Sequence, residues 1–299
     1  MTEAVVDASA SAETGARQNG AAPARRAILI TGCSSGIGRA AAFTLRARGW
    51  RVFAACRKQA DCDALIADGF ESPRIDYQDE ASILAGAEQV LQATDGKLYA
   101  LFNNGAFASP GATEDLPTDC LREIFEANFF GWHTLTRAVI PAMRRNREGR
   151  IVQCSSVLGF ATLKYRGAYQ ATKYALEGLT DTMRIEMHDS GIEVILIQPG
   201  PILTEIRRNS YSHFKKWITW EGSAHAHIYP KIEQRLTAES LKSKFELGPD
   251  AVVEKLIHAL ESSNPRPRYM VTFPTYLLFY LKKLLPSRAL DRLLIKQSY

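Results

Sequence analysis

The sequence lacks the long apolar run that a membrane-spanning helix requires. No stretch of about 20 consecutive apolar residues occurs among its 299 residues. Its first residues are rich in Ala, Ser and Gly and contain no hydrophobic segment, which excludes a secretory signal peptide. We therefore expect residues 1–25 to form a disordered leader and the folded chain to begin near residue 26.

Cysteines are few, odd in number and scattered. None of the five belongs to a Cys-x-x-Cys pair, so we expect neither a disulfide framework nor a zinc site. His213, His225 and His227 lie close in sequence, but they lack helical spacing and an acidic partner, and we predict no bound metal. Reduced thiols are typical of a cytoplasmic protein.

The chain has no concentrated basic stripe interleaved with aromatic residues. Its net charge of +5 comes from 37 Lys and Arg against 32 Asp and Glu, which is modest for this length. Nucleic acid is therefore not an expected partner. The balance is compatible with a phosphorylated, anionic small molecule.

Short apolar runs alternate with segments of helical periodicity from residue 26 onward. This alternation is typical of a parallel sheet covered by helices on both faces. We predict one α/β domain over residues 26–299, a doubly wound, Rossmann-type parallel sheet. The expected strands are residues 27–30, 51–56, 74–76, 98–102, 150–154 and 193–197. The expected helices lie within residues 38–48, 61–68, 80–94, 116–145 and 169–188.

A glycine-rich turn links the first expected strand to the first helix. Residues 31–38 read TGCSSGIG. Glycines here permit a tight turn and let a pyrophosphate approach main-chain N–H groups at a helix N-terminus. The predicted contacts with a dinucleotide come from Gly32, Ser34, Ser35, Gly36, Ile37 and Gly38.

The end of the second strand predicts which dinucleotide is bound. An acidic residue about 20 positions after the turn binds the ribose 2′-hydroxyl of NAD, whereas an Arg accommodates the 2′-phosphate of NADP. Here Arg57 and Lys58 follow Cys56, and the next carboxylate is Asp61. We therefore expect NADP(H) in preference to NAD(H), the alternative being that Arg57 is a solvated loop charge.

Tyr169 and Lys173 are four residues apart in an expected helix, so both side chains project from one face. A free phenol has a pKa of about 10, and a nearby ammonium lowers it. Tyr169 is thus a candidate acid/base for a carbonyl or alcohol oxygen. A Tyr packed on a Lys stem is the plain alternative.

Two further polar residues favour the catalytic interpretation. Ser156 lies just beyond the strand at residues 150–154, at the sheet edge where ligands bind. Ser155 is a rival candidate for the same role. Asn128 lies inside an expected helix, where a satisfied buried amide is the plain explanation.

Together these residues closely resemble the short-chain dehydrogenase/reductase family in its short, single-domain form. The resemblance covers nearly everything from Ala27 to Ile206. Its motifs are Thr31–Gly38, Asp76, Asn103-Asn104-Gly105, Asn128, Ser156, Tyr169 with Lys173, and Pro199-Gly200. One departure is that Gly105-Ala106 stands where the family usually has Ala-Gly.

The resemblance implies a role at each matched position. Tyr169 would exchange the proton, Lys173 would lower its pKa and bind the nicotinamide ribose, and Ser156 would orient the substrate oxygen. Asn128 would hold a water linked to Lys173. The remaining cofactor contacts would come from Asp76, Asn103, Gly105, Pro199, Gly200, Ile202 and Thr204.

The implied activity is interconversion of an alcohol and a ketone or aldehyde. Two alternatives are a non-catalytic NADP(H)-binding regulatory protein and an epimerase or dehydratase that retains NAD. We also expect a homo-oligomer, either a dimer or a tetramer.

The last hundred residues are less periodic. Residues 201–248 are rich in aromatics, which indicates either a substrate lid or a helical flap that packs those rings as core. The apolar, basic tail at residues 265–299 packs on the domain or a partner, or lies on a membrane surface, and packing is the favoured interpretation. The tail and the Arg57 region resemble the steroid- and retinol-oxidising branch, which implies an apolar substrate.

Overall fold

A six-stranded parallel sheet forms the centre of the computed structural model, which describes residues 25–239 and 243–296. The strand order is β2-β1-β3-β4-β5-β6. Every residue of β1 and β3 is buried, because helices cover both faces of the sheet. The strands are β1 (Ala27–Thr31), β2 (Arg51–Ala55), β3 (Leu98–Asn103), β4 (Gly149–Cys154), β5 (Ile192–Pro199) and β6 (Arg268–Val271).

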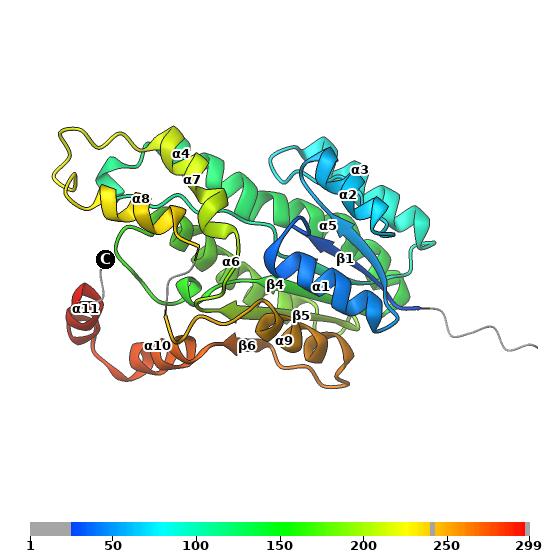
Figure 1. Cartoon of the computed structure of the whole chain (residues 1–299). Helices are drawn as coiled ribbons and strands as arrows, with labels where there is room; N and C mark the ends of the chain where they lie inside the picture. Colours follow the sequence, from blue (N-terminus) through cyan, green and yellow to red (C-terminus); the bar gives the residue numbers. More distant parts are fainter. Residues whose placement is uncertain (1–24, 240–242, 297–299) are drawn as a thin grey trace, which may run out of the picture.

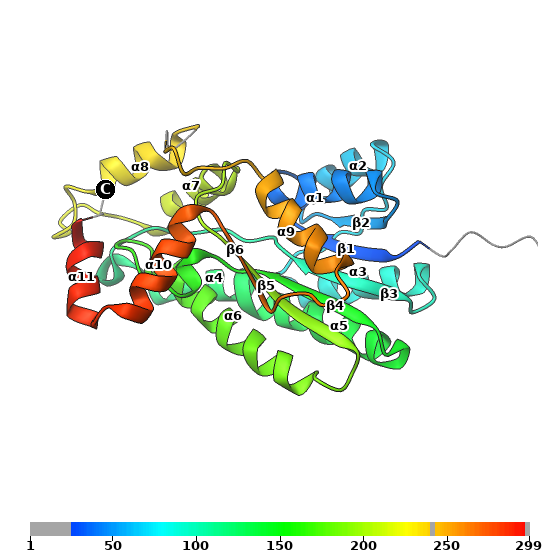
Figure 2. The same cartoon turned by 90° about the horizontal axis from the view of Figure 1, so that it is seen from below.

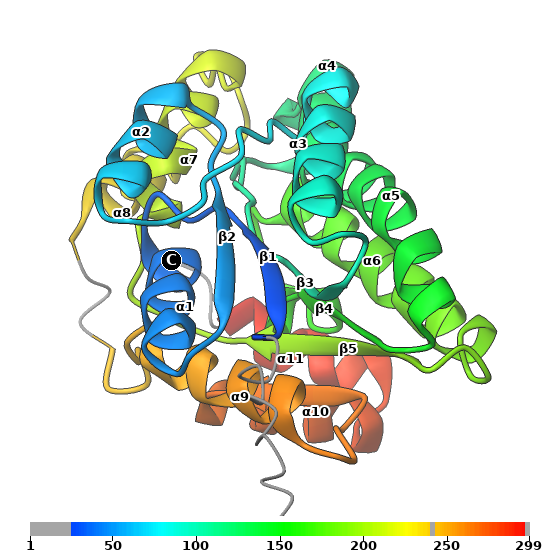
Figure 3. The same cartoon turned by 90° about the vertical axis from the view of Figure 1, so that its right-hand side faces the viewer.

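Two layers of helices enclose this sheet (Figure 1 and Figure 3). On one face α1 (Gly36–Ala47) packs against α9 (Asp250–Glu261), and α2 (Gln59–Ala67) lies beside β2. The other face is covered by α3 (Glu80–Ala93), α5 (Gly131–Asn146) and α6 (Gly167–Glu186). The predicted doubly wound, single-domain α/β architecture is confirmed.

A helical flap stands over the carboxyl ends of the strands. It consists of α7 (Ile206–Trp217) and α8 (Tyr229–Thr237), and a second apolar cluster joins it to α4 (Thr118–Phe125). Phe214 and Tyr229 are fully buried, and the Trp220 ring stacks on Tyr229 at 5.4 Å between centroids. Most aromatics of this segment therefore form the core of the flap.

Two helices follow the edge strand β6 in the described part of the chain. After β6 come α10 (Phe273–Leu284) and α11 (Ser287–Lys296), at the end of the molecule that also carries α7 and α8 (Figure 1 and Figure 2). The strand β6 pairs in parallel with β5, with Leu196 opposite Arg268 and Pro199 opposite Val271. The sequence did not predict this strand.

The strand expected at residues 74–76 is wrong: only an isolated bridge joins Arg74 to Cys56, because the segment turns directly into the loop before α3. Residues 1–24 of the expected leader, and residues 297–299 of the tail, lie outside the described residues. No described helix is both long and apolar enough to cross a bilayer.

Candidate active site

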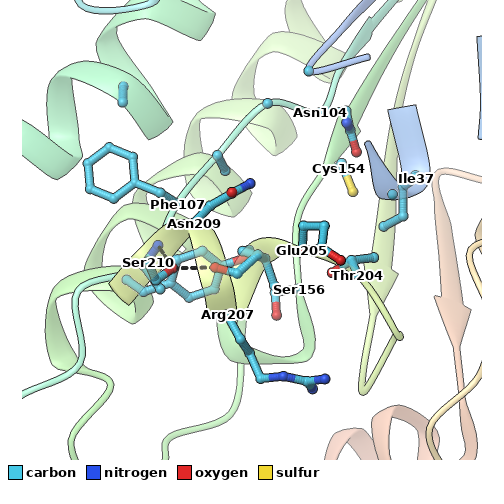
Figure 4. A pocket seen from close by; sticks show the side chains of 18 of the residues that line it. Ile37, Asn104, Phe107, Cys154, Ser156, Thr204, Glu205, Arg207, Asn209 and Ser210 are labelled. Carbon is cyan, nitrogen blue, oxygen red and sulfur yellow. Dashed lines mark hydrogen bonds between the residues drawn. The ribbon is translucent and has the colours of Figure 1, made fainter. Parts of the chain in front are cut away.

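A cleft of about 600 Å³ opens where the strand order reverses, at the carboxyl ends of β1 and β3. Open α/β sheets bind ligands at this kind of switch point. Its walls come from the loop after β1, the ends of β4 and β5, the start of α6, and α7 (Figure 4). All but three of the predicted site residues line this cleft, the exceptions being Gly38, Asn103 and Asn128.

The glycine-rich turn brings two backbone segments into close contact. Gly32 has φ +68°, and a Cβ atom added to it would lie 2.6 Å from the Cα of Gly105. Gly38 does not line the cleft. A Cβ atom added to it would lie 2.3 Å from the Gly32 carbonyl oxygen, so a glycine is needed for close packing. These glycines therefore set the shape of the turn through close packing.

The first turn of α1 is open toward the cleft. Its N-cap residue, Ser35, makes no side-chain capping hydrogen bond, and the first turn contains no carboxylate. Main-chain N–H groups and the positive end of the helix dipole are thus available to an anion. A pyrophosphate fits this arrangement.

Arg57 and Lys58 lie on the cleft wall beyond the end of β2, and both are exposed. Asp61 and Asp76 line the same region. Asp76 Oδ1 accepts a hydrogen bond from Gln78 N at 3.1 Å, which fixes the carboxylate at the loop. This end of the cleft presents both the cationic pair and the predicted adenine contact.

Asn103 is part of the protein interior. Its Nδ2 donates to Thr136 Oγ1 and to Gln153 Oε1, both at 3.0 Å, and its Oδ1 lies 2.7 Å from the Tyr77 hydroxyl. The side chain is fully buried and does not reach the cleft. Its role is to hold the end of β3.

Gly105 lines the cleft, and its carbonyl oxygen accepts a hydrogen bond from Trp132 Nε1 at 2.9 Å. A Cβ atom at this position would make only ordinary contacts, at 3.4 Å from Gly32 and Tyr77. The exchange of Gly and Ala at positions 105 and 106 is therefore tolerated sterically, and the end of β3 is intact.

Tyr169 and Lys173 lie one turn apart on α6, and both line the cleft. The Lys173 Nζ atom is 5.6 Å from the centroid of the Tyr169 ring and 4.1 Å from that of Trp132. It donates a hydrogen bond to the carbonyl oxygen of Cys154 at 2.8 Å. That bond ties α6 to the end of β4.

Burial is the main cause of the pKa shifts of Tyr169 and Lys173. Burial raises the pKa of Tyr169, and a hydrogen bond with Ser156 opposes the rise. Burial also lowers the pKa of Lys173 to about 8. Desolvation of the phenol outweighs the contact that favours its charged form, and the expected lowering of the Tyr169 pKa by Lys173 stays a prediction.

The structure distinguishes the two serines after β4. Ser156 caps the short 3₁₀ turn Val157–Gly159, accepting a hydrogen bond from Leu158 N at 3.1 Å, and it reaches Tyr169. Ser155 instead lies against Gly159. A Cβ atom added to Gly159 would lie 2.6 Å from Ser155 Oγ. Both serines line the cleft, and Ser156 is the one whose contact lowers the pKa of Tyr169.

Asn128 sits in the π-helical turn Glu126–Phe130 between α4 and α5. It is fully buried. Its Nδ2 donates to the Phe107 carbonyl oxygen at 2.8 Å, and its Oδ1 accepts from Phe107 N at 3.2 Å. The amide is 3.4 Å from Thr172 Oγ1, on the residue before Lys173. These contacts hold Asn128 behind Tyr169 and Lys173 and tie it to the Phe107 segment.

The corner after β5 lines the same cleft as Tyr169 and Lys173. Pro199, Gly200, Ile202 and Thr204 all line it. A Cβ atom at Gly200 would lie 2.2 Å from Thr272 Oγ1, so the corner packs tightly on the start of α10. The predicted nicotinamide contacts are thus brought together with Tyr169.

Several cleft residues come from α7, in the segment expected as a substrate lid or flap, but none of them was among the predicted site residues. Arg207, Ser210 and His213 face the cleft from this helix (Figure 4 labels Arg207 and Ser210). Arg207 is largely buried and pairs with Glu246, with 2.8 Å between Nη1 and Oε1. The His213 ring stacks on Phe107 at 3.6 Å. The sequence of this segment has no motif that marks these positions.

The family model for short chain dehydrogenases matches residues 26–214, more than half of the chain. The chain belongs to the short-chain dehydrogenase family. It is an NAD(P)-dependent oxidoreductase, as the oxidoreductase names of its relatives indicate.

Three curated relatives illustrate this similarity. The chain is 39% identical over 270 residues to the uncharacterized oxidoreductase YbbO of Escherichia coli K12, covering 90% of this chain and 94% of that protein. It is 30% identical to the NADPH-dependent 3-dehydrocapnine reductase of Ornithobacterium rhinotracheale, with 91% and 96% covered. It is 33% identical to rat 17-beta-hydroxysteroid dehydrogenase type 6, with 89% and 87% covered.

Solved structures support the same fold. A short-chain dehydrogenase from Streptomyces avermitilis superposes with a TM-score of 0.72 at 27% identity, covering 90% of this chain and 95% of that one. A Burkholderia cenocepacia short chain dehydrogenase in complex with NADP has a TM-score of 0.71 at 21% identity, with 90% and 97% covered. The second likeness concerns the fold alone.

All five cysteines are buried free thiols. In the described part of the chain no cluster of His, Cys, Asp or Glu has the arrangement of a metal site.

Proposed function

We propose that the chain interconverts an alcohol and a ketone or aldehyde, with NADP(H) as cofactor and Tyr169 as acid/base. The observation that carries the proposal is the position of Tyr169 in the cleft. Ser156 and the Pro199-Gly200 corner line the same cavity, and Lys173 lies one turn further along α6.

The nicotinamide, when bound, supplies or accepts the hydride. In reduction, Tyr169 donates its phenolic proton to the carbonyl oxygen, and Ser156 donates a hydrogen bond to the same oxygen. A proton donor must carry its proton at neutral pH, as a phenol does, although burial, which raises the pKa of Tyr169, makes it a weaker acid. Lys173 adds positive charge beside the phenol when oxidation requires the phenolate.

The preference for NADP(H) rests on Arg57 and Lys58. A guanidinium can bind a phosphate through two parallel hydrogen bonds, and the adjacent ammonium adds attraction. No carboxylate occupies the position after β2 where the 2′-hydroxyl of NAD would be bound. The printed name of the Ornithobacterium rhinotracheale relative, an NADPH-dependent reductase, is in accord with this preference.

The cleft favours an apolar substrate. Phe107, Leu158, Leu163 and Leu236 line it, beside the polar Ser210 and His213 of α7. Apolar walls with few polar groups are typical of sites for lipophilic ligands. Relatives named retinol dehydrogenase 16 and 17-beta-hydroxysteroid dehydrogenase type 6 agree with a steroid-, retinoid- or long-chain-like substrate.

Replacement of Tyr169 tests the proposed chemistry. Tyr169→Phe should lower kcat for carbonyl reduction by about 10²–10⁴-fold, since it removes only the proton donor. NADPH affinity, measured by fluorescence titration, should stay within about twofold of wild type because the ring remains.

Tyr174→Phe on the same helix is the matched control, because Tyr174 does not line the cleft. It should keep wild-type turnover. Retained activity in Tyr169→Phe, or an equal loss in both variants, would refute the proposed role.

A further inference from the structure

The outer face of α10 is apolar and exposed. Phe273 is 60% exposed, Tyr276 41%, Leu277 42%, Tyr280 56% and Leu284 77%. Their spacing of three and four residues places them on one stripe of the helix. A continuous apolar stripe turned to solvent indicates a surface that meets another apolar phase.

The opposite face of α10 is fixed to the domain. Thr275 is fully buried, and Phe279 packs edge-on against Phe160 at 5.7 Å between ring centroids. Lys282 Nζ donates to the Phe160 carbonyl oxygen at 2.6 Å. The helix therefore holds its orientation, and the exposed stripe is a property of the folded chain.

Neighbouring segments extend this apolar surface. The Phe245 ring stacks on Phe273 at 5.4 Å. Leu247 is 41% exposed and its carbonyl oxygen accepts a hydrogen bond from Leu203 N, whose own side chain is 45% exposed. On α11, Leu293 and Ile295 are also exposed.

The charges around this surface have mainly one sign. Asp291 is the only carboxylate among residues 273–296. The cations there are Lys282, Lys283, Arg288, Arg292 and Lys296, all of them exposed. An amphipathic helical segment with aromatic and Leu residues beside Lys and Arg is typical of binding at a membrane surface.

We infer that α10 and α11 bind the surface of a membrane that contains anionic lipids. The apolar stripe can bury itself among the acyl chains of such a membrane, while the anionic headgroups attract the surrounding cations. A second copy of the chain fits less well, because a twofold interface on this face would bring like charges together.

The position of the surface links it to the cleft. Leu158 and Leu163 line the cleft, and Phe160 between them contacts α10. Figure 1 and Figure 2 both place α10 and α11 at the end of the molecule that carries α7 and α8. An apolar molecule dissolved in the lipid would thus meet the cleft at the membrane surface.

Vesicle co-flotation of the full chain tests the inference independently of any activity. The vesicles are phosphatidylcholine alone or phosphatidylcholine with phosphatidylserine. The protein should float with the anionic vesicles, and added salt should weaken binding. The variant Leu277→Glu with Tyr280→Glu and Leu284→Glu should lose flotation. Its matched control places Glu at Ile66, Leu84 and Ile185, which are exposed elsewhere, and should float like wild type.

A charge variant gives a second test that leaves the apolar stripe unchanged. Lys283→Glu with Arg288→Glu and Arg292→Glu should weaken binding by about fivefold or more for each cation removed. The control Lys97→Glu, Arg137→Glu and Arg145→Glu makes the same change in net charge on other surfaces. Thermal midpoints and NADPH titration show that each variant is folded.

Three outcomes would overturn the inference. One is the absence of binding to anionic vesicles. Another is an equal loss of vesicle binding in the test and control variants. The third is a concentration-dependent dimer that the Leu277, Tyr280 and Leu284 substitutions abolish, since a second copy would then cover this face.

Discussion

Burial and hydrogen bonding act in opposite directions on the pKa of Tyr169. Burial raises it, and the contact with Ser156 lowers it. Lys173 stands one turn away but directs its ammonium to the Cys154 carbonyl oxygen. The phenol is therefore held in its protonated form, beside a buried cation that can respond to the charge of a reacting group.

Lys173 makes the free energy of unfolding depend on pH in the alkaline range. Burial lowers its pKa from 10.5 to about 8, so between these values the unfolded chain binds more protons than the folded one. The free energy of unfolding then rises with pH across that window, and the full penalty of the buried charge applies below about pH 8.

Lys173→Met should remove this penalty. We expect it to raise the free energy of unfolding by about 1–2 kcal/mol at pH 7, after the lost hydrogen bond is counted. The gain should shrink as the pH rises toward 10. Urea unfolding of both proteins at pH 7, 8.5 and 10 measures this, and a pH-independent difference would contradict the explanation.

Arg57 is the residue on which cofactor preference depends. Arg57→Ala should raise the Kd for NADPH about tenfold, because a charge-assisted phosphate contact is lost. The Kd for NADH should change less than about twofold.

Fluorescence titration with both cofactors measures the two constants. Arg137→Ala, an exposed Arg on α5 outside the cleft, is the control. Equal weakening of both cofactors by Arg57→Ala would exclude a role in binding the 2′-phosphate.

At the scale of elements, the start of α5 depends on a glycine. A Cβ atom at Gly131 would lie 2.4 Å from the Tyr77 carbonyl oxygen and 2.6 Å from Tyr77 Cβ. Tyr77 cannot move away easily, because its hydroxyl lies 2.7 Å from both Thr31 Oγ1 and Asn103 Oδ1. Helix α5 is thus fitted closely to the loop before α3.

Gly131→Ala should lower the free energy of unfolding by about 2–3 kcal/mol through overpacking. Gly178→Ala on α6 is the matched control, because a Cβ there meets no atom within 4 Å. It should stabilise the protein by about 0.5–1 kcal/mol through helix propensity. Denaturant midpoints compare the two, and similar effects of both substitutions would contradict the packing argument.

Elements fixed by local patterns were predictable, and those fixed by distant contacts were not. The apolar run of β1 followed by the glycine-rich turn predicted its strand, helix and cofactor contacts together. Strand β6 has four residues, begins with Arg268 and exists through pairing with β5, so no local signal marks it. The same holds for Arg207 on α7, which reaches the cleft through the fold of the flap.

Sequence reasoning also placed side chains on the right elements without fixing their orientation. Asn103 and Asn128 were both expected at the site, and both are fully buried behind it. Their amides hold the end of β3 and the Phe107 segment. The presence of an Asn in a motif does not indicate whether its amide will face the cleft or the protein interior.

At the scale of the whole molecule, the cleft is lined by residues from distant parts of the chain. The strand ends of the sheet carry the predicted dinucleotide contacts, and α7 of the flap lines the same cleft. Cations outnumber carboxylates on the cleft wall, which suits a phosphorylated cofactor. The expected homo-oligomer and the cytoplasmic location stay predictions.

The central claim is hydride transfer between NADP(H) and a carbonyl compound, and isotope transfer tests it most directly. NADPH carrying deuterium at C4 of the nicotinamide is incubated with the enzyme and retinoid, steroid and long-chain carbonyl compounds. Mass spectrometry of the products should show deuterium on the carbinol carbon, with NADH far less effective than NADPH. Absence of deuterium transfer to every compound, despite tight NADPH binding, would contradict the account.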